Sequence, residues 1–520
     1  MGADEFQSWS LKGRSVDWLE LKAQYPEPAG QPPRCAELLA LRRVLDGTQY
    51  DDLPNPFSRE KSGAGEYIPL SKRRPSVRSN LCSAVVDEST SLLFGDTHWP
   101  TIKADHSNTA DALACFVRES DLPALMLDAA RRGSVGSVAL LVETVKRVLR
   151  VSVLDTAYLT PAWDGATREL TRVVERYMLT GQQLAEAGFE IPTERMQVKF
   201  WWRREWDDQA VTVYVPQPVA ADAPEPVIDA TRSVTHGLGF VPIVWIRNLA
   251  PASQVGEPDG PCTFGRAIDT VIEADYLLSQ GSRALKYMSD PVLVLKSGGA
   301  PGGAAHQGGS ASALNLPPEG DAKLLEINGA ASGALLEMYR ELRALVLEQL
   351  HGNRAHADKL SAAQSGRAME MMCQSLIWLA DRLRQSYGDG GLLPLLKMAC
   401  RFSSALTDGV RIGGTDRKSL DPTGLDLHWP DWFPPTTPEL LTLAQGLVTA
   451  VDGNILSNET AVQIYAARAG VPDGAGEWQR VSAQIRDAEA KAAQAAAAAK
   501  ASDDRKAAIV GNTLSHQVEA

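Results

Sequence analysis

The middle of this chain alternates between helical and extended patterns in an order that few folds can accommodate. Apolar side chains recur at helical spacing over residues 265–290 and again over 332–350. Between them lie two short apolar runs, 290–297 and 321–328, which predict strands, and a stretch rich in glycine and alanine, 298–312, which predicts a mobile loop. The order predicts a hairpin of two helices that carries a small module of strands at its tip.

A long apolar segment follows this hairpin. Residues 351–368 are small and polar, and they lead into a segment that continues at helical spacing to Phe402. Because glycine and proline weaken a helix interior, the segment predicts one unusually long helix with a break or kink. The interrupting residues are Gly388, Gly390, Gly391 and Pro394.

The first part of the chain is predicted to be helical. Residues 1–65 are rich in proline, glycine and tryptophan, and they predict an arm with one short helix over 15–24 and another that begins at Cys35. We expect a helix over 74–94, with Pro75 in its first turn and Gly95 after its end, and one helix over 108–132 that Gly133 stops.

Residues 134–248 are predicted to be mainly β, because short runs of β-branched and aromatic residues alternate with turn residues. An aromatic and basic run begins at Phe200 and includes Trp201, Arg203 and Trp206. Such a run could stack on nucleic-acid bases. Packing of one strand face, with the arginines stacked on aromatic rings of the other, is the favoured interpretation.

The end of the chain returns to helices. A strand is expected near residues 425–432, a helix that starts near Thr437, a turn at Asp452–Gly453 and a second helix. From about Gly476 the composition becomes alanine-rich with few large apolar groups, which predicts a solvated helix.

Composition and charge exclude some classes of protein. Apolar residues make up 44% of the 520 residues and charged residues 22%, which predicts a folded chain. The formal net charge of −12 argues against a protein that grips DNA by neutralising phosphates. The six cysteines are scattered without a CxxC pair, and no secretory signal or apolar run of about 18 residues is present, so we expect no disulfide framework, zinc motif or membrane contact.

No catalytic signature stands out, so neither catalytic residues, nor a metal, nor a cofactor is expected. Residues 413–419 resemble a phosphate-binding loop in composition only, and a plain turn is the favoured interpretation. His351 and His356 lie five positions apart around a loop, without partners at metal-ligand spacing. The acidic pairs at 51–52 and 207–208 are expected to be solvated surface.

Five segments, in this order, resemble the tailed-bacteriophage portal protein family, most closely its siphophage-type members. The similarity covers roughly residues 75 to 470. The segments are Arg78–Ser79–Asn80 to Phe94–Gly95, Leu238–Gly239–Phe240–Val241–Pro242–Ile243–Val244, Gly265–Arg266–Ala267–Ile268 to Asp290–Pro291, Ser365–Gly366–Arg367–Ala368–Met369–Glu370, and Trp429–Pro430–Asp431 to Glu439 with Gly453–Asn454–Ile455–Leu456–Ser457–Asn458–Glu459–Thr460.

The resemblance implies an α+β portal fold with a β-rich wing, a helical-hairpin stem, a small α/β clip, a long kinked backbone helix and a helical C-terminal crown. This chain departs from the family in its short clip and in the glycine-rich loop within it. The implied segments are an N-terminal arm (1–65), a wing of helices and β structure (66–264), a first stem helix (265–290), the clip (291–328), a second stem helix (329–350), a tunnel loop (351–365), the long kinked helix (366–403), a return strand of the wing (404–440), and the crown with a C-terminal tail (441–520).

Two groups of polar residues are candidates for the wall of a DNA channel. The tunnel loop carries the basic groups Arg354, His356 and Lys359 among small residues, with Ser361 and Gln364 beside them, and a ring of such loops could touch phosphates weakly. A plain helix-to-helix connector with solvated charges is the alternative. The first stem helix carries the charges Glu273, Asp275, Arg283 and Lys286, which would either face the channel or form salt bridges between subunits.

The resemblance also implies partners and a location. A closed homo-oligomeric ring, a dodecamer, would pass double-stranded DNA without sequence preference at one capsid vertex during packaging, retention and ejection of the genome. Terminase large subunit, a head-completion or adaptor protein, and the major capsid and scaffolding proteins would be partners, in the virion and, during assembly, in the host cytoplasm. The alternatives are another phage head–tail connector or minor capsid protein, and an uncharacterised soluble enzyme.

Overall fold

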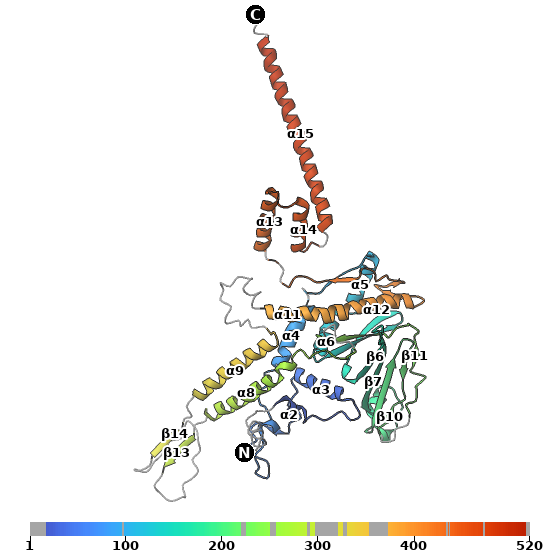
Figure 1. The fold of residues 1–520 in the computed structure, drawn as a ribbon, viewed down its shortest axis with the longest axis vertical. Helices are drawn as coiled ribbons and strands as arrows, with labels where there is room; N and C mark the ends of the chain where they lie inside the picture. The colour runs from blue at the N-terminus through green and yellow to red at the C-terminus, as the bar shows by residue number, and fades with distance from the viewer. Residues whose placement is uncertain are drawn as a thin grey trace. The chain divides into compact units, whose positions relative to one another are not determined.

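A computed structural model of the chain describes residues 17–95, 98–219, 225–249, 256–288, 292–296, 321–325, 330–352, 373–432, 435, 437–471 and 474–515. The fold mixes helices and strands, as expected for an α+β protein (Figure 1). It divides into two compact units, Met1–Pro430 and Asp431–Ala520, which are described separately.

The first helices pack into the core of the first unit. The predicted arm helices are α2 (Trp18–Lys22) and α3 (Pro33–Leu45), followed by β1 (Asn55–Pro56), η1 (Leu70–Lys72) and β2 (Arg73–Arg74). The helix predicted over 74–94 is shorter than expected, because α4 covers only Leu81–Phe94. The placement of Pro75 in its first turn was therefore wrong: Asn80 has a left-handed φ of 49°, which ends helical geometry before α4 begins. Gly95 follows the helix, as predicted.

The single helix predicted over 108–132 is two helices, α5 (Ser107–Glu119) and α6 (Leu122–Gly133). Asp121 between them is left-handed, with φ 47°, and Pro123 lies in the first turn of α6. Proline has no N–H to donate to the preceding turn, so it is tolerated at the start of a helix and not within one. The prediction of one helix was wrong because the apolar periodicity continues across the break.

Residues 134–248 are mainly β, as predicted, and form most of two sheets. The first sheet has the strand order β12-β4-β5-β15-β16, and β15 joins β5 in parallel from far along the chain. The second has the order β11-β9-β8-β7-β6, with β10 paired to β8. The strands are β4 (Ser137–Val145), β5 (Val148–Leu154), β6 (Leu159–Trp163), β7 (Leu170–Thr180), β8 (Lys199–Trp206), β9 (Ala210–Val213), β10 (Gln217–Pro218), β11 (Val234–Thr235), β12 (Ile243–Arg247), β15 (Val410–Ile412) and β16 (Thr415–Arg417), and the short helices among them are η2 (Thr156–Tyr158), α7 (Gly181–Glu186) and η3 (Thr193–Arg195).

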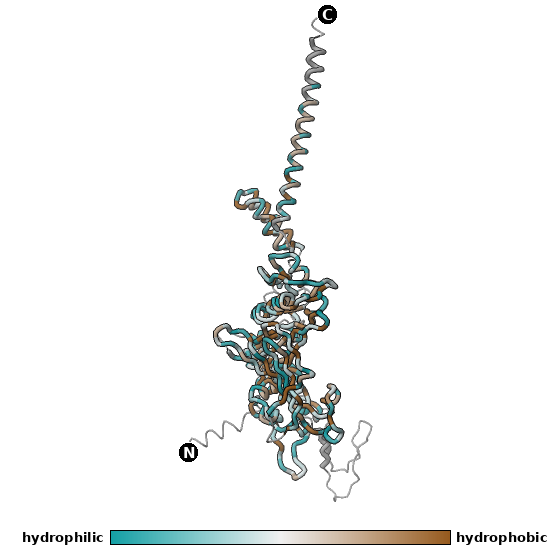
Figure 2. Tube along the Cα trace, turned by 90° about the vertical axis from the view of Figure 1, so that its right-hand side faces the viewer, coloured by the Kyte–Doolittle hydropathy of each residue, from teal (hydrophilic) through white to brown (hydrophobic). Residues whose placement is uncertain are grey.

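Strand β4 is apolar from Val138 to Val142, because both of its faces are covered over these residues. Val138, Leu140 and Val142 join the large core cluster, while Ala139 and Leu141 join a second cluster. This alternation follows from the two-residue period of a strand. Figure 2 shows hydrophobic residues, in brown, concentrated in the body of this unit.

The aromatic run of β8 serves packing, as favoured from the sequence. Phe200 and Trp206 are buried. The guanidinium of Arg204 lies 4.3 Å from the ring centre of Trp206, and that of Arg176 lies 4.0 Å from the ring centre of Trp201. These rings are therefore covered by arginines of the same chain.

The predicted hairpin is present. A turn of 3-10 helix, η4 (Gly265–Ala267), leads into α8 (Ile268–Met288), and α9 (Ala330–Gln349) lies beside α8 (Figure 1). The two predicted strands, β13 (Val292–Lys296) and β14 (Asp321–Leu325), pair antiparallel, with Val292 opposite Leu325 and Lys296 opposite Asp321. The predicted loop over 298–312 lies outside the described residues.

The long helix is interrupted where its glycines predicted an interruption. It consists of α11 (Gln374–Leu383), a π-helical segment η6 (Arg384–Leu392) and α12 (Leu393–Ala405). A π segment keeps the helix continuous while it widens the turn, so the chain is not broken at this point. The first residues of the predicted helix, 366–372, lie outside the described part of the chain.

Glycines allow η6 to pack closely against its neighbours. A Cβ atom at Gly388 would lie 2.4 Å from the ring of Trp429, and one at Gly391 would lie 2.6 Å from the side chain of Ile246. The fully buried Tyr387 donates a 3.0 Å hydrogen bond from its hydroxyl to Oδ1 of Asn248. The π segment is therefore fixed to the first sheet.

The remaining strands of this unit follow the long helix. The loop between β15 and β16 has left-handed glycines, Gly413 (φ 61°) and Gly414 (φ 70°), as a two-residue hairpin turn requires. The predicted turn is therefore confirmed at residues 413–414, whereas residues 415–417 of the same segment form strand β16. The strand predicted near 425–432 is β17 (Asp426–His428), which pairs with β3 (Thr101–Lys103).

The second unit is helical: α13 (Thr437–Asp452), α14 (Asn458–Arg468) and α15 (Gly474–Ser515). The hydroxyl of Ser457 accepts a hydrogen bond from the backbone N–H of Thr460, which caps α14 and explains the turn sequence before it. Every residue of α13 is described and none is fully buried. The described side chains of the alanine-rich part of α15 are exposed, as predicted.

We expect Tyr387→Phe to lower the free energy of unfolding by about 1–2 kcal/mol, because Oδ1 of the buried Asn248 loses the hydrogen bond that this hydroxyl donates. Denaturant unfolding followed by tryptophan fluorescence measures the change. The matched control, Tyr67→Phe, removes a hydroxyl from a tyrosine that is 65% exposed and should leave stability nearly unchanged. Equal stabilities of the two variants would contradict this assignment.

Candidate functional site

The helical hairpin α8–α9 is the candidate site, because it is the part of the fold that the predicted channel requires. At its base α8 is buried nearly all around, which is typical of a helix inside a core. The apolar residues buried there are Val271, Ile272, Ala274 and Tyr276. Two polar residues, Asp275 and Ser279, are buried beside them, and each is 0% exposed.

Asp275 binds two segments that lie far away in the sequence. One carboxylate oxygen accepts a 2.7 Å hydrogen bond from the backbone N–H of Ser79, and the other accepts a 3.0 Å bond from the hydroxyl of Tyr50. Burial raises the pKa of Asp275 above its usual range, although the bonds from Ser79 and Tyr50 oppose this shift. The carboxylate thus connects α8 to the N-terminal part of the chain.

Ser279, one helical turn further on, holds the same segment. Its hydroxyl oxygen accepts hydrogen bonds from the backbone N–H groups of Ser76 and Val77, at 3.0 and 3.1 Å, and donates to the carbonyl of Asp275. The N–H groups of Ser76 and Val77 lie beyond the β1–β2 pairing, which ends at Arg74, so the acceptors on α8 take the place of a sheet neighbour. We call residues 73–80 the clamped segment.

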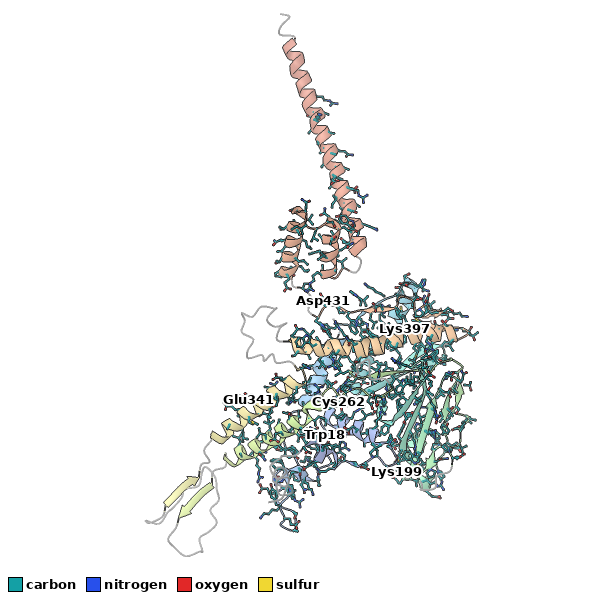
Figure 3. The ribbon with its side chains drawn as sticks, in the orientation of Figure 1. Trp18, Lys199, Cys262, Glu341, Lys397 and Asp431 are labelled. Atoms are coloured by element: carbon teal, nitrogen blue, oxygen red, sulfur yellow. The ribbon has the colours of Figure 1, made fainter. Side chains whose placement is uncertain are left out.

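Further contacts fix both ends of this base. The hydroxyl of Tyr276 donates a 2.8 Å bond to the carbonyl of Arg73, at the start of the clamped segment. The backbone N–H of Trp18, which is labelled in Figure 3, donates to the carboxylate of Asp269 at 2.7 Å, so α2 holds the first turn of α8. Together these bonds tie α8 to the clamped segment and to α2.

The C-terminal end of α9 is fixed to the same core. Val346, Leu347 and Leu350 are buried. His351 has a left-handed φ of 57°, and the N–H of Gly352 bonds back to the carbonyl of Leu347, which closes the helix. Both helices of the hairpin therefore extend from the same buried base.

The four predicted stem charges have different environments. Asp275 was predicted to face a channel or a neighbouring subunit, and this was wrong, because it is enclosed by its own chain. Arg283 forms an ion pair with Glu60 at 2.5 Å. Glu273 is half-buried, and burial raises its pKa. Lys286 is exposed.

The tunnel-loop residues cannot be located in the same way. Arg354, His356, Lys359, Ser361 and Gln364 lie outside the described residues. Their roles in DNA contact remain predictions from the sequence.

Apart from Asp275, the residues that build the base were not singled out from the sequence. Ser279 and Tyr276 look like ordinary positions of an amphipathic helix. One signal was available: Asp275 and Ser279 are four residues apart on the apolar side of α8, where two polar groups need buried partners. Their partners, such as Tyr50 and Ser79, could not be identified without the fold.

The described residues hold neither a cluster suited to a metal ion nor a helix suited to a membrane. No group of three or more His, Cys, Asp or Glu side chains that could hold a metal ion occurs among them. None of the helices in the described part of the chain combines the length and apolar character needed to cross a membrane.

No protein family matches the sequence, and no curated protein matches it. Two solved structures are similar in part. A chain from the virion of a native gene transfer agent particle is 12% identical and has a TM-score of 0.34, covering 74% of this chain and 88% of its own length. A chain from the neck of an empty gene transfer agent particle is 13% identical and has a TM-score of 0.35. The match covers 87% of this chain and 98% of the neck chain. These TM-scores are too low to assign a fold or a function to this chain.

The raised pKa of Asp275 predicts a pH dependence of stability. The folded state binds the proton of Asp275 more tightly than the unfolded chain does. The stabilisation from this proton is therefore complete below the usual aspartate pKa of about 4, and it is lost as the pH rises through the higher pKa of the folded state. Asp275→Asn should remove this decline, so that the free energy of unfolding falls less steeply with rising pH than in the unmodified chain.

Urea unfolding at a series of pH values from about 4 upward measures the two slopes. The control is Asp111→Asn, an exposed position on α5, which should keep the slope of the unmodified chain. Identical slopes for Asp275→Asn and the unmodified chain would show that this carboxylate does not titrate as described.

Proposed function

We propose that this chain is the subunit of a phage portal, a closed ring whose central hole conducts double-stranded DNA at one capsid vertex. The observation that carries the proposal is the hairpin of α8 and α9, closed by the paired strands β13 and β14 and followed by the long helix α11–η6–α12. This is the order of elements in the family that the sequence resembles. The ring would serve genome packaging, retention and ejection.

The hairpin has dimensions that suit the wall of a channel. Helices α8 and α9 have 21 and 20 residues, so each is about 30 Å long. Copies of such a hairpin, arranged around an axis, would line a hole with helices rather than with loops. The hole between subunits, and not a pocket within one, would then be the working part.

The base of the hairpin supports such a wall. DNA that moves through a channel pushes on the wall, so each hairpin needs a rigid attachment to its subunit. The bonds from Asp275 and Ser279 to the clamped segment, and the buried end of α9, provide this attachment. Asp275, which was expected to lie in the channel wall, would instead hold the wall in place.

The charge of the chain suits transient contact with DNA. A net charge of −12 does not favour tight binding to phosphates, which a conduit must avoid. In this proposal the tunnel loops, with Arg354, His356, Lys359, Ser361 and Gln364, make the weak and reversible contacts. No catalytic residue and no cofactor takes part.

The proposed partners follow from this role. They are terminase large subunit at the clip during packaging, a head-completion or adaptor protein afterwards, and the major capsid and scaffolding proteins around the ring. A dodecamer in the virion, assembled in the host cytoplasm, is the proposed state. A simpler head–tail connector would not need the long interrupted helix, which favours the portal over that alternative.

The purified chain is expected to form rings with a central hole in negative-stain electron microscopy, because heterologous contacts whose rotation closes produce a ring. Mass photometry of the same sample should give one assembly of fixed subunit number. A chain that stays monomeric at high concentration would refute the proposal.

Deletion of residues 298–312 should leave rings intact and weaken DNA packaging, because this segment lies between the clip strands β13 and β14. Packaging is measured as nuclease-protected DNA in assembled particles, and rings by microscopy. Replacement by a glycine–serine linker of equal length separates the loss of length from the loss of these residues. Normal packaging by the deletion variant would show that the segment is dispensable.

A further inference from the structure

Helix α9 exposes large apolar side chains on both sides of its buried row. The buried row includes Leu342 and Val346. Met338 and Leu345 are 49% and 43% exposed, and because they are about two turns apart they lie on one side of this row. Leu336 is 47% exposed and lies on the other side, nearly opposite Met338.

A cavity opens on the Leu336 side of the hairpin. It has a volume of about 350 Å³ and lies between α8, α9 and the clamped segment. Gly281 leaves room there, since a Cβ at this position would meet only Leu335, at 3.6 Å. The side chains around it are mostly apolar and include Val77, Leu278, Leu285 and Leu336.

The two sides of the hairpin carry opposite charges. Glu341 is exposed one turn from both Met338 and Leu345, and Glu337 is exposed one turn before Glu341 (Glu341 is labelled in Figure 3). Arg340 and Lys286 are exposed beside Leu336 and the cavity. Within the described part of the chain, none of these four charged side chains forms an ion pair. We call the first side the acidic edge and the second the basic edge.

Single exposed apolar side chains are common and need no explanation. Here, however, apolar groups, unpaired charges and a cavity coincide on opposite edges of one hairpin, and each edge offers what the other lacks. A contact between two like edges would bring equal charges together, which is unfavourable. The complementary arrangement is the acidic edge of one copy against the basic edge of the next.

We propose that this hairpin binds a second copy of the chain head to tail. Met338 and Leu345 on the acidic edge of one copy fill the cavity beside Leu336 and Leu285 of the neighbouring copy. Glu337 and Glu341 then pair with Arg340 and Lys286 of that neighbour. The inference deepens the proposed function, and rests on it for the closure of the contacts into a ring.

Charge reversal on single edges tests this contact. One variant, Glu337→Lys with Glu341→Lys, makes both edges basic, and the other, Lys286→Glu with Arg340→Glu, makes both edges acidic. Each variant alone should need about tenfold or more of the concentration that the unmodified full-length chain needs to assemble. An equimolar mixture should assemble normally, in alternating order, because every contact then joins a basic edge to an acidic one.

Mass photometry of each variant and of the mixture gives the result, and circular dichroism melting shows that the variants are folded. Normal assembly of a single variant, or failure of the mixture of folded variants, would overturn the inference. If each variant alone still forms normal rings, this contact is overturned and the proposed function stays intact. If the assemblies are open chains, and the substitutions weaken their formation as expected, the contact is supported and the closed ring is refuted.

Cross-linking gives a second, independent test. In a variant with both Leu336→Cys and Leu345→Cys, oxidation should produce a ladder of covalent species beyond the dimer, because each copy offers one thiol to each neighbour. Either substitution alone should add no cross-link to those of the unmodified chain. New dimers from a variant with only one added cysteine would indicate contact between like edges and contradict the head-to-tail arrangement.

Discussion

The hydrogen bonds that α8 accepts inside the core are the constraint on which the rest of the structure depends. An acidic helix residue and a hydroxyl one turn later lie where apolar side chains would otherwise be, and both need partners there. The clamped segment supplies these partners as backbone N–H groups. Because Asp275 also accepts the hydroxyl of Tyr50, three distant parts of the chain meet at one carboxylate. The direction in which the hairpin leaves the core is set by this junction.

Much of this architecture could be predicted from patterns that are local in the sequence. The paired helices, the two strands between them, the β-rich middle and the interruption of the long helix were all predicted correctly. The failures occurred at single residues. Asn80 and Asp121 take left-handed conformations that end or separate helices, while the apolar periodicity runs on without a sign of either. Short polar residues adopt this conformation at moderate cost, so the sequence alone does not reveal where they do so.

The site was less accessible to prediction than the fold. A charged residue on a helix is exposed in most proteins, and this default placed Asp275 on a surface. Its actual partners, Ser79 and Tyr50, are 196 and 225 positions away in the sequence, and no local pattern connects them to Asp275. Lys286 illustrates the opposite case, because it follows the default and lies on the surface. The side of a helix that faces its own core is decided by packing between distant segments, which the periodicity of one helix cannot reveal.

The π-helical segment η6 sets the rotational phase of the long helix. In an ordinary helix each residue advances the direction of the side chains by about 100°, whereas a wider turn advances them less. The nine residues of η6 therefore determine which side chains α12 presents to the core once α11 is in place. Gain or loss of one residue within 384–392 would turn one half of this helix against the other, so the length of the segment is under the same structural control as its sequence.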